Sequence, residues 1–251
     1  ISFVYLTRIF DRVDNPQNNV LGTRFNNITY LQLALQYDLS KKTQAELGIS
    51  AVHISNANTG NPNLGANIPG VFVGVRWRNS SENISNLKKA SGRSDFSTQW
   101  GLGIRIGAGR VANLRAGGPR YGAYSLAIFG TMQTSPTLRW VMGVKGYQLG
   151  NIQAFIEDQD IVELDAWQGS TGAVWYGGID WMLGRFALAV YMGPYLKEPY
   201  LSSNNLYTQL GVQWHLWNQQ HKPKWNPFIG LYVHAHSGQA DFGELALGII
   251  F

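Results

Sequence analysis

The chain has 251 residues, of which 45% are hydrophobic and only 14% are charged, with 29 glycines and no cysteine. The lack of cysteine excludes disulfides and thiolate metal sites. The net charge of +5 comes without any run of Lys or Arg interleaved with aromatic residues, which argues against a nucleic-acid-binding protein.

No apolar run approaches the roughly 20 residues that a membrane-spanning helix needs. The sequence instead repeats segments of about ten alternating residues separated by turn residues, which is typical of a transmembrane β-barrel. A water-soluble β-sandwich is the alternative, because it also has short alternating strands. Alternating apolar faces recur on nearly every segment, and this favours an all-β, antiparallel outer-membrane barrel that forms a single domain over residues 1–251. The scattered cations are then expected to face lipid phosphates.

In chain order, the first predicted strands lie at 1–10 and 25–39, and the second sets alternating leucines against Gln, Ala and Asp. A short turn at 40–43 leads into a strand that ends in His53-Ile54-Ser55. The remaining strands are predicted at 71–78, 98–110, 121–133, 137–147, 170–183, 185–195, 205–217, 227–236 and 240–251. This gives about 12 strands, an even number as in bacterial barrels.

The connections are predicted to alternate between the two sides of the membrane. Short turns at 40–43, 134–136 and 184 fall on the inner side, as the barrel rule requires. The longer loops fall on the outer side: 11–24, 55–69, 111–120, 148–168 and 197–204. The polar segment 79–95 is an exception, because it is long where a turn should be short. The chain begins at Ile1 without a signal peptide, so we interpret it as processed or as lacking its native N-terminus.

The strand that ends at Ser55 carries the strongest chemical signal. Residues i and i+2 of a strand point the same way, so the side chains of His53 and Ser55 are neighbours at the end of an apolar face. An imidazole beside a hydroxyl is the minimum needed to activate a serine nucleophile. A polar pair is costly on a lipid-facing surface, so its presence near the outer rim indicates a functional role. The loop that follows offers amides that can orient the histidine: Asn56, Asn58, Asn61, Asn63 and Asn67.

The motif His53-Ile54-Ser55-Asn56, followed by Pro62-Asn63-Leu64-Gly65-Ala66-Asn67, resembles the lipid A 3-O-deacylase family (PagL-type acyloxyacyl hydrolases). The resemblance is strongest to the longer branch of Bacteroidetes-like bacteria, and it covers residues 11–78 and 234–251. It implies Ser55 as nucleophile, His53 as general base and Asn67 as the residue that orients His53. It also implies that Asn56 helps to form the oxyanion hole, and that Asn58, Asn63 and Gly65 contribute to the oxyanion or substrate site.

Asn67 is a departure from the family pattern, since the shorter members place a glutamate at this spacing. An amide can still hold an imidazole, as in the Ser-His-Asn site of outer-membrane phospholipase A, which this arrangement also resembles. An amide stabilises an imidazolium less than a carboxylate does, so slower chemistry is expected.

Other polar residues are expected to have structural roles. His234, His236, Asp241 and Glu244 predict a polar network in the barrel interior, with a metal site as the alternative. Arg76, Arg78, Arg105 and Lys145 are expected to pair inside the barrel with Asp38, Glu46, Asp180 and Glu244, with an anion-selective pore as the alternative. The acidic residues of 157–165 read as a solvated loop, with a cation site as the alternative. Tryptophans near strand ends indicate interfacial girdles: Trp77, Trp100, Trp140, Trp167, Trp181, Trp217 and Trp225.

The sequence therefore predicts a barrel in the bacterial outer membrane that acts as a serine esterase on an ester-linked acyl chain of lipid A, with no cofactor and no metal. Two alternatives stay open. One is a phospholipase of the same geometry, and the other is an inactive barrel that serves as a pore or as a subunit of a membrane complex. Protein partners and a homodimer are left undetermined.

Overall fold

The computed structural model describes residues 2–77, 96–161, 163–201, 206–218, 224–236 and 239–251. Two groups of strands follow one another along the chain. The first comprises β1 (Ser2–Tyr5), β2 (Phe25–Asp38), β3 (Thr43–Ser55) and β4 (Ala66–Trp77). The second comprises β5 (Gln99–Ala112), β6 (Arg120–Ser135), β7 (Leu138–Leu149), β8 (Thr171–Leu183), β9 (Phe186–Lys197), β10 (Leu206–His215), β11 (Asn226–His236) and β12 (Gln239–Ile250).

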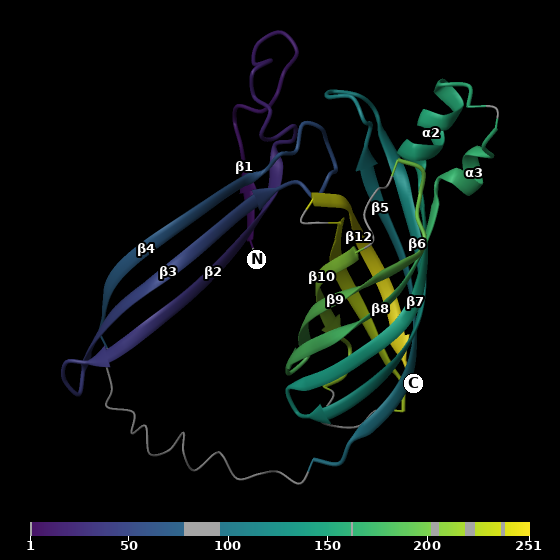
Figure 1. Ribbon diagram of the computed structural model, residues 1–251. Helices are drawn as coiled ribbons and strands as arrows, with labels where there is room; N and C mark the ends of the chain where they lie inside the picture. The colour runs from purple at the N-terminus through teal and green to yellow at the C-terminus, as the bar shows by residue number, and fades with distance from the viewer. Residues whose placement is uncertain (1, 78–95, 162, 202–205, 219–223, 237–238) are drawn as a thin grey trace.

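Strands β5–β12 form a closed antiparallel barrel (Figure 1). Consecutive strands pair with each other, and β12 closes the circle by pairing with β5, for example Leu247 with Ile106. Alternate residues point outward and are exposed and apolar, such as Leu102, Ile104 and Ile106. The residues between them point inward, and large buried side chains fill the interior. Eight strands give a barrel whose interior side chains are enough to fill it, which is what the described residues show.

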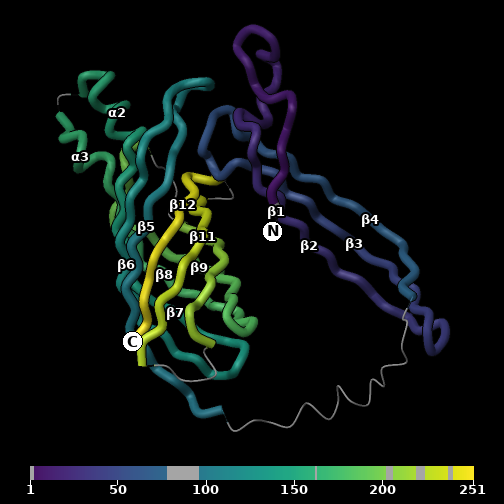
Figure 2. The backbone as a smooth tube through the Cα atoms, turned by 180° about the vertical axis from the view of Figure 1, so that it is seen from behind, coloured from purple at the N-terminus to yellow at the C-terminus, as the bar shows by residue number. Residues whose placement is uncertain are grey.

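Strands β1–β4 form a separate open sheet in which β2, β3 and β4 pair along most of their length. Figures 1 and 2 show this sheet leaning away from the barrel, with the two parts meeting at one end. One face of the sheet is strongly apolar and exposed, and it includes Leu33, Ile49 and Val71, which lie side by side on three strands. The opposite face carries Gln36, Glu46 and other polar or small side chains.

The prediction of one barrel of about 12 strands is therefore wrong, because the closed barrel contains eight strands and β1–β4 lie outside it. The predicted strand positions agree with the structure to within a few residues, with two exceptions. The first strand covers only Ser2–Tyr5 and not 1–10, and β4 begins at Ala66, within the loop predicted at 55–69. Alternation shows which face a residue is on but does not show which strands close the circle. The segment 79–95 lies outside the described residues, and the single domain over residues 1–251 stays a prediction.

The connection predicted as a loop at 148–168 contains two short helices, α2 (Gly150–Asp158) and α3 (Ala166–Gly169). Helix α2 buries Ile152 and Ile156, which are one helical turn apart. This i, i+4 spacing is the signal that identifies an amphipathic helix. None of the helices in the described ranges is long and apolar enough to cross a membrane.

The predicted interior network is present for two of its four members. Lys145 Nζ lies 3.0 Å from Glu244 Oε1, and His234 Nε2 lies 3.2 Å from the same oxygen, with all three side chains fully buried. The other two members, His236 and Asp241, pair with each other near the ends of β11 and β12, where both are partly exposed. In the described part of the chain, no three His, Asp or Glu side chains are grouped so that they could hold a metal ion.

The predicted ion pairs of the basic residues need correction. Arg76 Nη2 contacts Glu46 Oε1 at 2.7 Å, but on the open sheet and not inside the barrel. Asp180 pairs with Arg139, at 2.6 Å, and Arg105 donates to Gln209 Oε1 at 3.2 Å. Arg78 lies outside the described residues. The filled interior gives no support to the pore interpretation.

Candidate active site

His53, Ser55 and Asn67 lie together at the end of the open sheet that meets the barrel. His53 and Ser55 lie at the end of β3 on the same face of the strand, because residues i and i+2 point the same way. Asn67 of β4 pairs with His53 across the sheet. His53 Nε2 lies 3.0 Å from Ser55 Oγ, and His53 Nδ1 lies 2.7 Å from Asn67 Oδ1. The structure therefore brings together all three residues predicted to be catalytic.

The direction of these hydrogen bonds follows from the chemistry of Asn67. An amide oxygen can only accept, so His53 Nδ1 carries the hydrogen and donates it to Asn67 Oδ1. His53 Nε2 is then the acceptor, and it takes the hydrogen bond from the Ser55 hydroxyl. A histidine held in this tautomer is able to remove the proton of Ser55, which is the arrangement of a serine hydrolase triad.

The site lies at the boundary between an apolar surface and a polar loop. Along β3, the same face carries Leu47 and Ile49, whose side chains are 55% and 59% exposed. Ser55, at the end of the strand, is only 5% exposed. A ligand with a long apolar chain and a polar head can therefore lie along the sheet with its head near Ser55.

Residues 56–65 form a compact loop held by its own polar groups. The Asn56 backbone N–H donates to Asn63 Oδ1 at 3.0 Å, and Asn56 Nδ2 donates to the Gly60 carbonyl at 2.7 Å. Gly65 adopts a φ of +70°, where a side chain is strained, and a β-carbon there would come within 2.9 Å of the Ile54 carbonyl oxygen. These contacts fix the backbone on both sides of Ser55.

The same loop is attached to the rim of the barrel. Asn58 Nδ2 donates to the Asp241 carbonyl of β12 at 2.8 Å, and the Asn58 carbonyl accepts from the Ala112 N–H of β5 at 2.7 Å. Asn61 Nδ2 donates to the Asn113 carbonyl at 2.6 Å. The loop therefore sits on the point where β5 and β12 meet, and the sequence alone did not predict this contact because it joins residues up to 183 positions apart.

The residues expected at the oxyanion or substrate site are all in this loop, but their roles stay predictions. Asn58 is directed at the barrel rim, and Asn63 accepts from the backbone of Asn56. The backbone N–H of Asn56 and one N–H of its side-chain amide are engaged within the loop, which leaves the second Nδ2–H as the donor for an oxyanion role. Gly65 lies beside the site, since a β-carbon on it would be 3.5 Å from His53 Cε1.

Three arginines close to the loop were not singled out in the sequence. Arg12 Nη2 donates to the Ala116 carbonyl in the β5–β6 loop at 2.9 Å. A β-carbon on Gly60 would lie 3.4 Å from Arg120 Nη2, so this guanidinium borders the loop of residues 56–65. Arg115 is in the same β5–β6 loop and is exposed. Their only signal in the sequence is that they are scattered cations in predicted outer loops.

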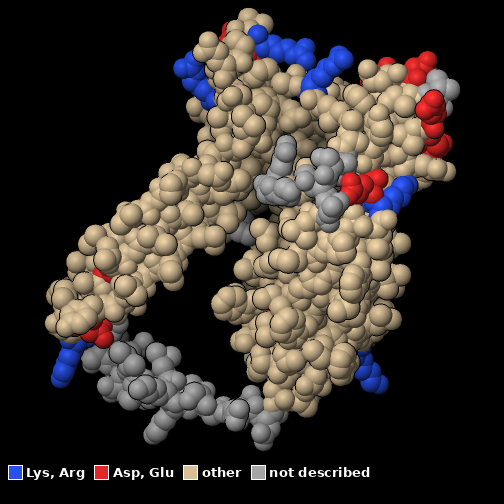
Figure 3. All heavy atoms as spheres, viewed as in Figure 1, with Lys and Arg blue, Asp and Glu red and all other residues tan. Residues whose placement is uncertain are grey.

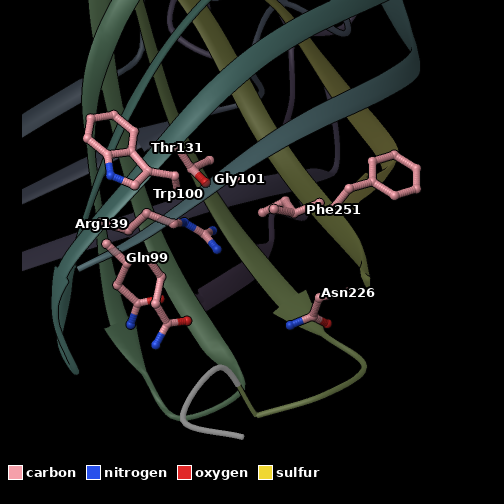
Figure 4. Close-up of a pocket in the computed structure, with 9 residues that line it drawn as sticks. Gln99, Trp100, Gly101, Thr131, Arg139, Asn226 and Phe251 are labelled. Carbon is pink, nitrogen blue, oxygen red and sulfur yellow. The ribbon is translucent and has the colours of Figure 1, made fainter. Parts of the chain in front are cut away.

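A polar cavity lies at the end of the barrel away from Ser55 (Figure 4). It has a volume of about 70 Å³, room for about two waters, and its lining includes Gln99, Arg139, Asn226 and Phe251. Arg139 is already paired with Asp180, and its Nη1 atom has no partner among the described residues. The cavity is too small for a lipid.

Comparisons with known proteins identify the family of the chain. The family model described as "Lipid A 3-O-deacylase (PagL)" matches residues 4–76, which contain β2, β3 and all of β4 except Trp77. The model described as "Acyloxyacyl hydrolase, C-terminal domain" matches residues 86–251, which contain the barrel. No curated protein sequence matches the chain. The crystal structure of a Pseudomonas aeruginosa FadL homologue matches 91% of this chain and 67% of its own, at 10% identity and a TM-score of 0.22, which is too low to carry an argument.

Proposed function

Because the chain belongs to the PagL family of lipid A deacylases and acyloxyacyl hydrolases, we propose that it is an outer-membrane serine esterase that removes an ester-linked acyl chain from lipid A. The observation that carries the proposal is the hydrogen-bonded line from Asn67 through His53 to Ser55, at the end of an exposed apolar sheet face. A family of lipid A deacylases supplies the substrate class, and the three side chains supply the chemistry.

The first half of the reaction transfers the acyl group to the enzyme. Ser55 Oγ attacks the carbonyl carbon of the acyl ester while His53 Nε2 takes the hydroxyl proton. The His53 imidazolium is held by its Nδ1–H bond to Asn67. The tetrahedral intermediate then collapses, the bond to the sugar oxygen breaks, and that oxygen leaves with the proton from Nε2. The products are an acylated Ser55 and a lipid A with one free hydroxyl.

The second half returns the enzyme to its starting state. A water molecule attacks the acyl carbonyl, and His53 Nε2 takes one of its protons. The ester bond to Ser55 breaks, Ser55 Oγ regains a proton from Nε2, and the fatty acid is released. Each step uses only the acid and base properties of His53, so the sequence of steps requires no cofactor.

The position of Ser55 fits an ester that lies at the boundary of the lipid layer. The exposed apolar residues of β2, β3 and β4 continue from the site along the sheet, as Leu33, Ile49 and Val71 show. An acyl chain that lies on this face buries apolar surface, which favours binding by about 0.8 kcal/mol per CH₂ group. The carbonyl carbon at the head of that chain then reaches the level of Ser55.

The second candidate is a phospholipase that hydrolyses glycerophospholipids with the same three residues. The observation that favours it is the amide of Asn67, since the family pattern has a carboxylate at this position. Both candidates predict an acylated Ser55 and differ in the headgroup.

The deciding experiment is mass spectrometry of lipid A and phospholipids from cells that express the chain or its Ser55→Ala variant. Loss of one acyl mass from lipid A with the parent chain, and not with Ser55→Ala, is expected. If lipid A stays intact while phospholipids become lyso forms, the phospholipase is correct. If both lipids stay intact while the protein is folded in the membrane, neither enzyme proposal holds.

A further inference from the structure

The end of the molecule that carries Ser55 has an uneven distribution of charge. We call residues 56–65, which follow Ser55, the catalytic loop. The neighbouring segments, the β1–β2 connection and the β5–β6 hairpin, contain six arginines: Arg8, Arg12, Arg24, Arg110, Arg115 and Arg120. Five acidic residues lie on α2, α3 and their connection: Glu157, Asp158, Asp160, Glu163 and Asp165. Two more, Asp11 and Asp14, lie in the β1–β2 connection on either side of Arg12. Figure 3 shows Lys and Arg over the loops above β1 and β5, with some Asp and Glu among them, and a second group of Asp and Glu near α2 and α3.

Arg12 and Arg120 border the catalytic loop from two directions. Arg12 lies across the β5–β6 loop through its bond to Ala116, and that loop is bonded to Asn61 through the Gly117 N–H at 3.1 Å. Arg120 lies against Gly60, whose carbonyl accepts the side-chain bond of Asn56. Asn56 follows Ser55 directly in the chain. Arg120 is therefore linked to Ser55 through its contact with Gly60 and the hydrogen bond between Gly60 and Asn56.

These guanidinium groups are available for an anion. In the part of the chain that the structure describes, Arg12, Arg115 and Arg120 form no ion pair with a carboxylate, whereas Arg76, Arg139 and Lys145 all do. All three arginines are exposed. A guanidinium binds a phosphate through two parallel N–H bonds, and this is the geometry that arginine offers better than lysine.

We propose that Arg12, Arg115 and Arg120 form a subsite for a phosphomonoester on the headgroup of the lipid whose acyl ester is presented to Ser55. The inference rests on the proposed deacylase function and adds the role of the barrel. The open sheet supplies the nucleophile and its base, while the β5–β6 hairpin of the barrel supplies Arg115 and Arg120.

The test compares two forms of one substrate in detergent micelles. One is lipid A with its phosphate groups, and the other is the same lipid A after phosphatase treatment. The purified parent chain is assayed for kcat and KM by mass spectrometry of the released fatty acid. The variants are Arg120→Gln and Arg12→Gln, with Arg120→Lys as the charge-conserving version. Arg185→Gln is the matched control, because Arg185 is an exposed arginine in the β8–β9 turn.

We expect Arg120→Gln to raise KM for phosphorylated lipid A by about tenfold, the effect of one lost charge-assisted bond at an exposed site. KM for the phosphatase-treated substrate and kcat for both should stay the same, and Arg120→Lys should restore part of the loss. Arg185→Gln should change neither substrate. Equal changes on both substrates would show that Arg120 only supports the loop, and no change on either would show that it does not contact the headgroup. Either result overturns the subsite.

Inorganic phosphate separates the two possible sources of the recognised group. If millimolar phosphate inhibits hydrolysis of the phosphorylated substrate and not of the phosphatase-treated one, the subsite binds the phosphate group by itself. If phosphate inhibits neither, the subsite also requires the sugar.

If the folded parent chain hydrolyses neither substrate, the deacylase proposal fails, but the subsite is still tested by binding. The Ser55→Ala protein should then bind micelles of phosphorylated lipid A more tightly than treated micelles, and the preference should disappear with Arg120→Gln. Equal binding would refute it.

Discussion

The contact between Asn67 and His53 is the part of the site that departs from the family pattern, and it allows a quantitative prediction. In Asn67→Ala the Nδ1–H of His53 loses its acceptor at 2.7 Å. A neutral hydrogen bond contributes about 1 kcal/mol, and one to a charged group about 1.5–3 kcal/mol. Because His53 becomes charged in the transition state, the net loss of transition-state stabilisation is about 1–2 kcal/mol. This corresponds to a fall in kcat/KM of about 5- to 30-fold.

The matching change in the opposite direction is Asn67→Asp, which keeps the shape of the side chain and replaces the amide by a carboxylate. The hydrogen bond to the imidazolium then becomes charge-assisted and about twice as strong, so we expect kcat/KM to rise by about tenfold. The assay is the release of fatty acid from lipid A by purified protein, with Ser50→Ala as a control on the opposite face of β3. If Asn67→Ala retains activity within about twofold of the parent while Ser55→Ala is inactive, the assignment of Asn67 as the orienting residue is wrong.

Three further changes test the attachment of the loop and the barrel. Asn58→Gly keeps the left-handed backbone (φ of 57°) and removes the bond to β12, so kcat should fall by about fivefold while the barrel stays folded, as circular dichroism would show. Gly65→Ala places a β-carbon 2.9 Å from the Ile54 carbonyl at a positive φ, and activity should fall with a loss of about 1–2 kcal/mol in the free energy of unfolding in detergent. Lys145→Met removes the ammonium from the buried Glu244 and leaves it only the His234 and Ser125 contacts, so it should destabilise the barrel by about 3 kcal/mol in the same unfolding measurement, whereas Glu244→Asp should cost less.

The sequence predicts the strands well because alternation is a local property. Each strand of the barrel shows its apolar residues at every second position, as in Leu102, Ile104 and Ile106, and this pattern needs no knowledge of the neighbours. The closure of the barrel is not local. The pairing of β12 with β5 joins residues such as Leu247 and Ile106, which are about 140 positions apart, and the same alternating pattern is compatible with β4 or β5 as the neighbour. The division into an open sheet and a closed barrel of eight strands was therefore beyond the sequence.

In the candidate site, too, the local features follow from the sequence and the non-local contacts do not. The placement of His53 beside Ser55 follows from the period of a strand, and the structure has the two side chains in contact. Asn67 was assigned from the resemblance, and the pairing of β3 with β4 explains it, because register puts Asn67 opposite His53. The contacts of the loop with the barrel could not be predicted, since they depend on where β5 and β12 end in space. Arg120 was missed for this reason.

The proposed nucleophile lies outside the packed barrel, and the arrangement explains how the barrel supports it. A loop of ten residues that contains four asparagines, Asn56, Asn58, Asn61 and Asn63, would lose its position easily if it were attached only to the sheet. The bonds from Asn58 and Asn61 to the ends of β5 and β12 tie it to strands whose inner side chains are buried and paired. A catalytic group keeps its geometry when the element that supports it is rigid. Under the proposed function, the barrel is the support against which His53 and Ser55 are held, while the apolar sheet stays free to receive the acyl chain.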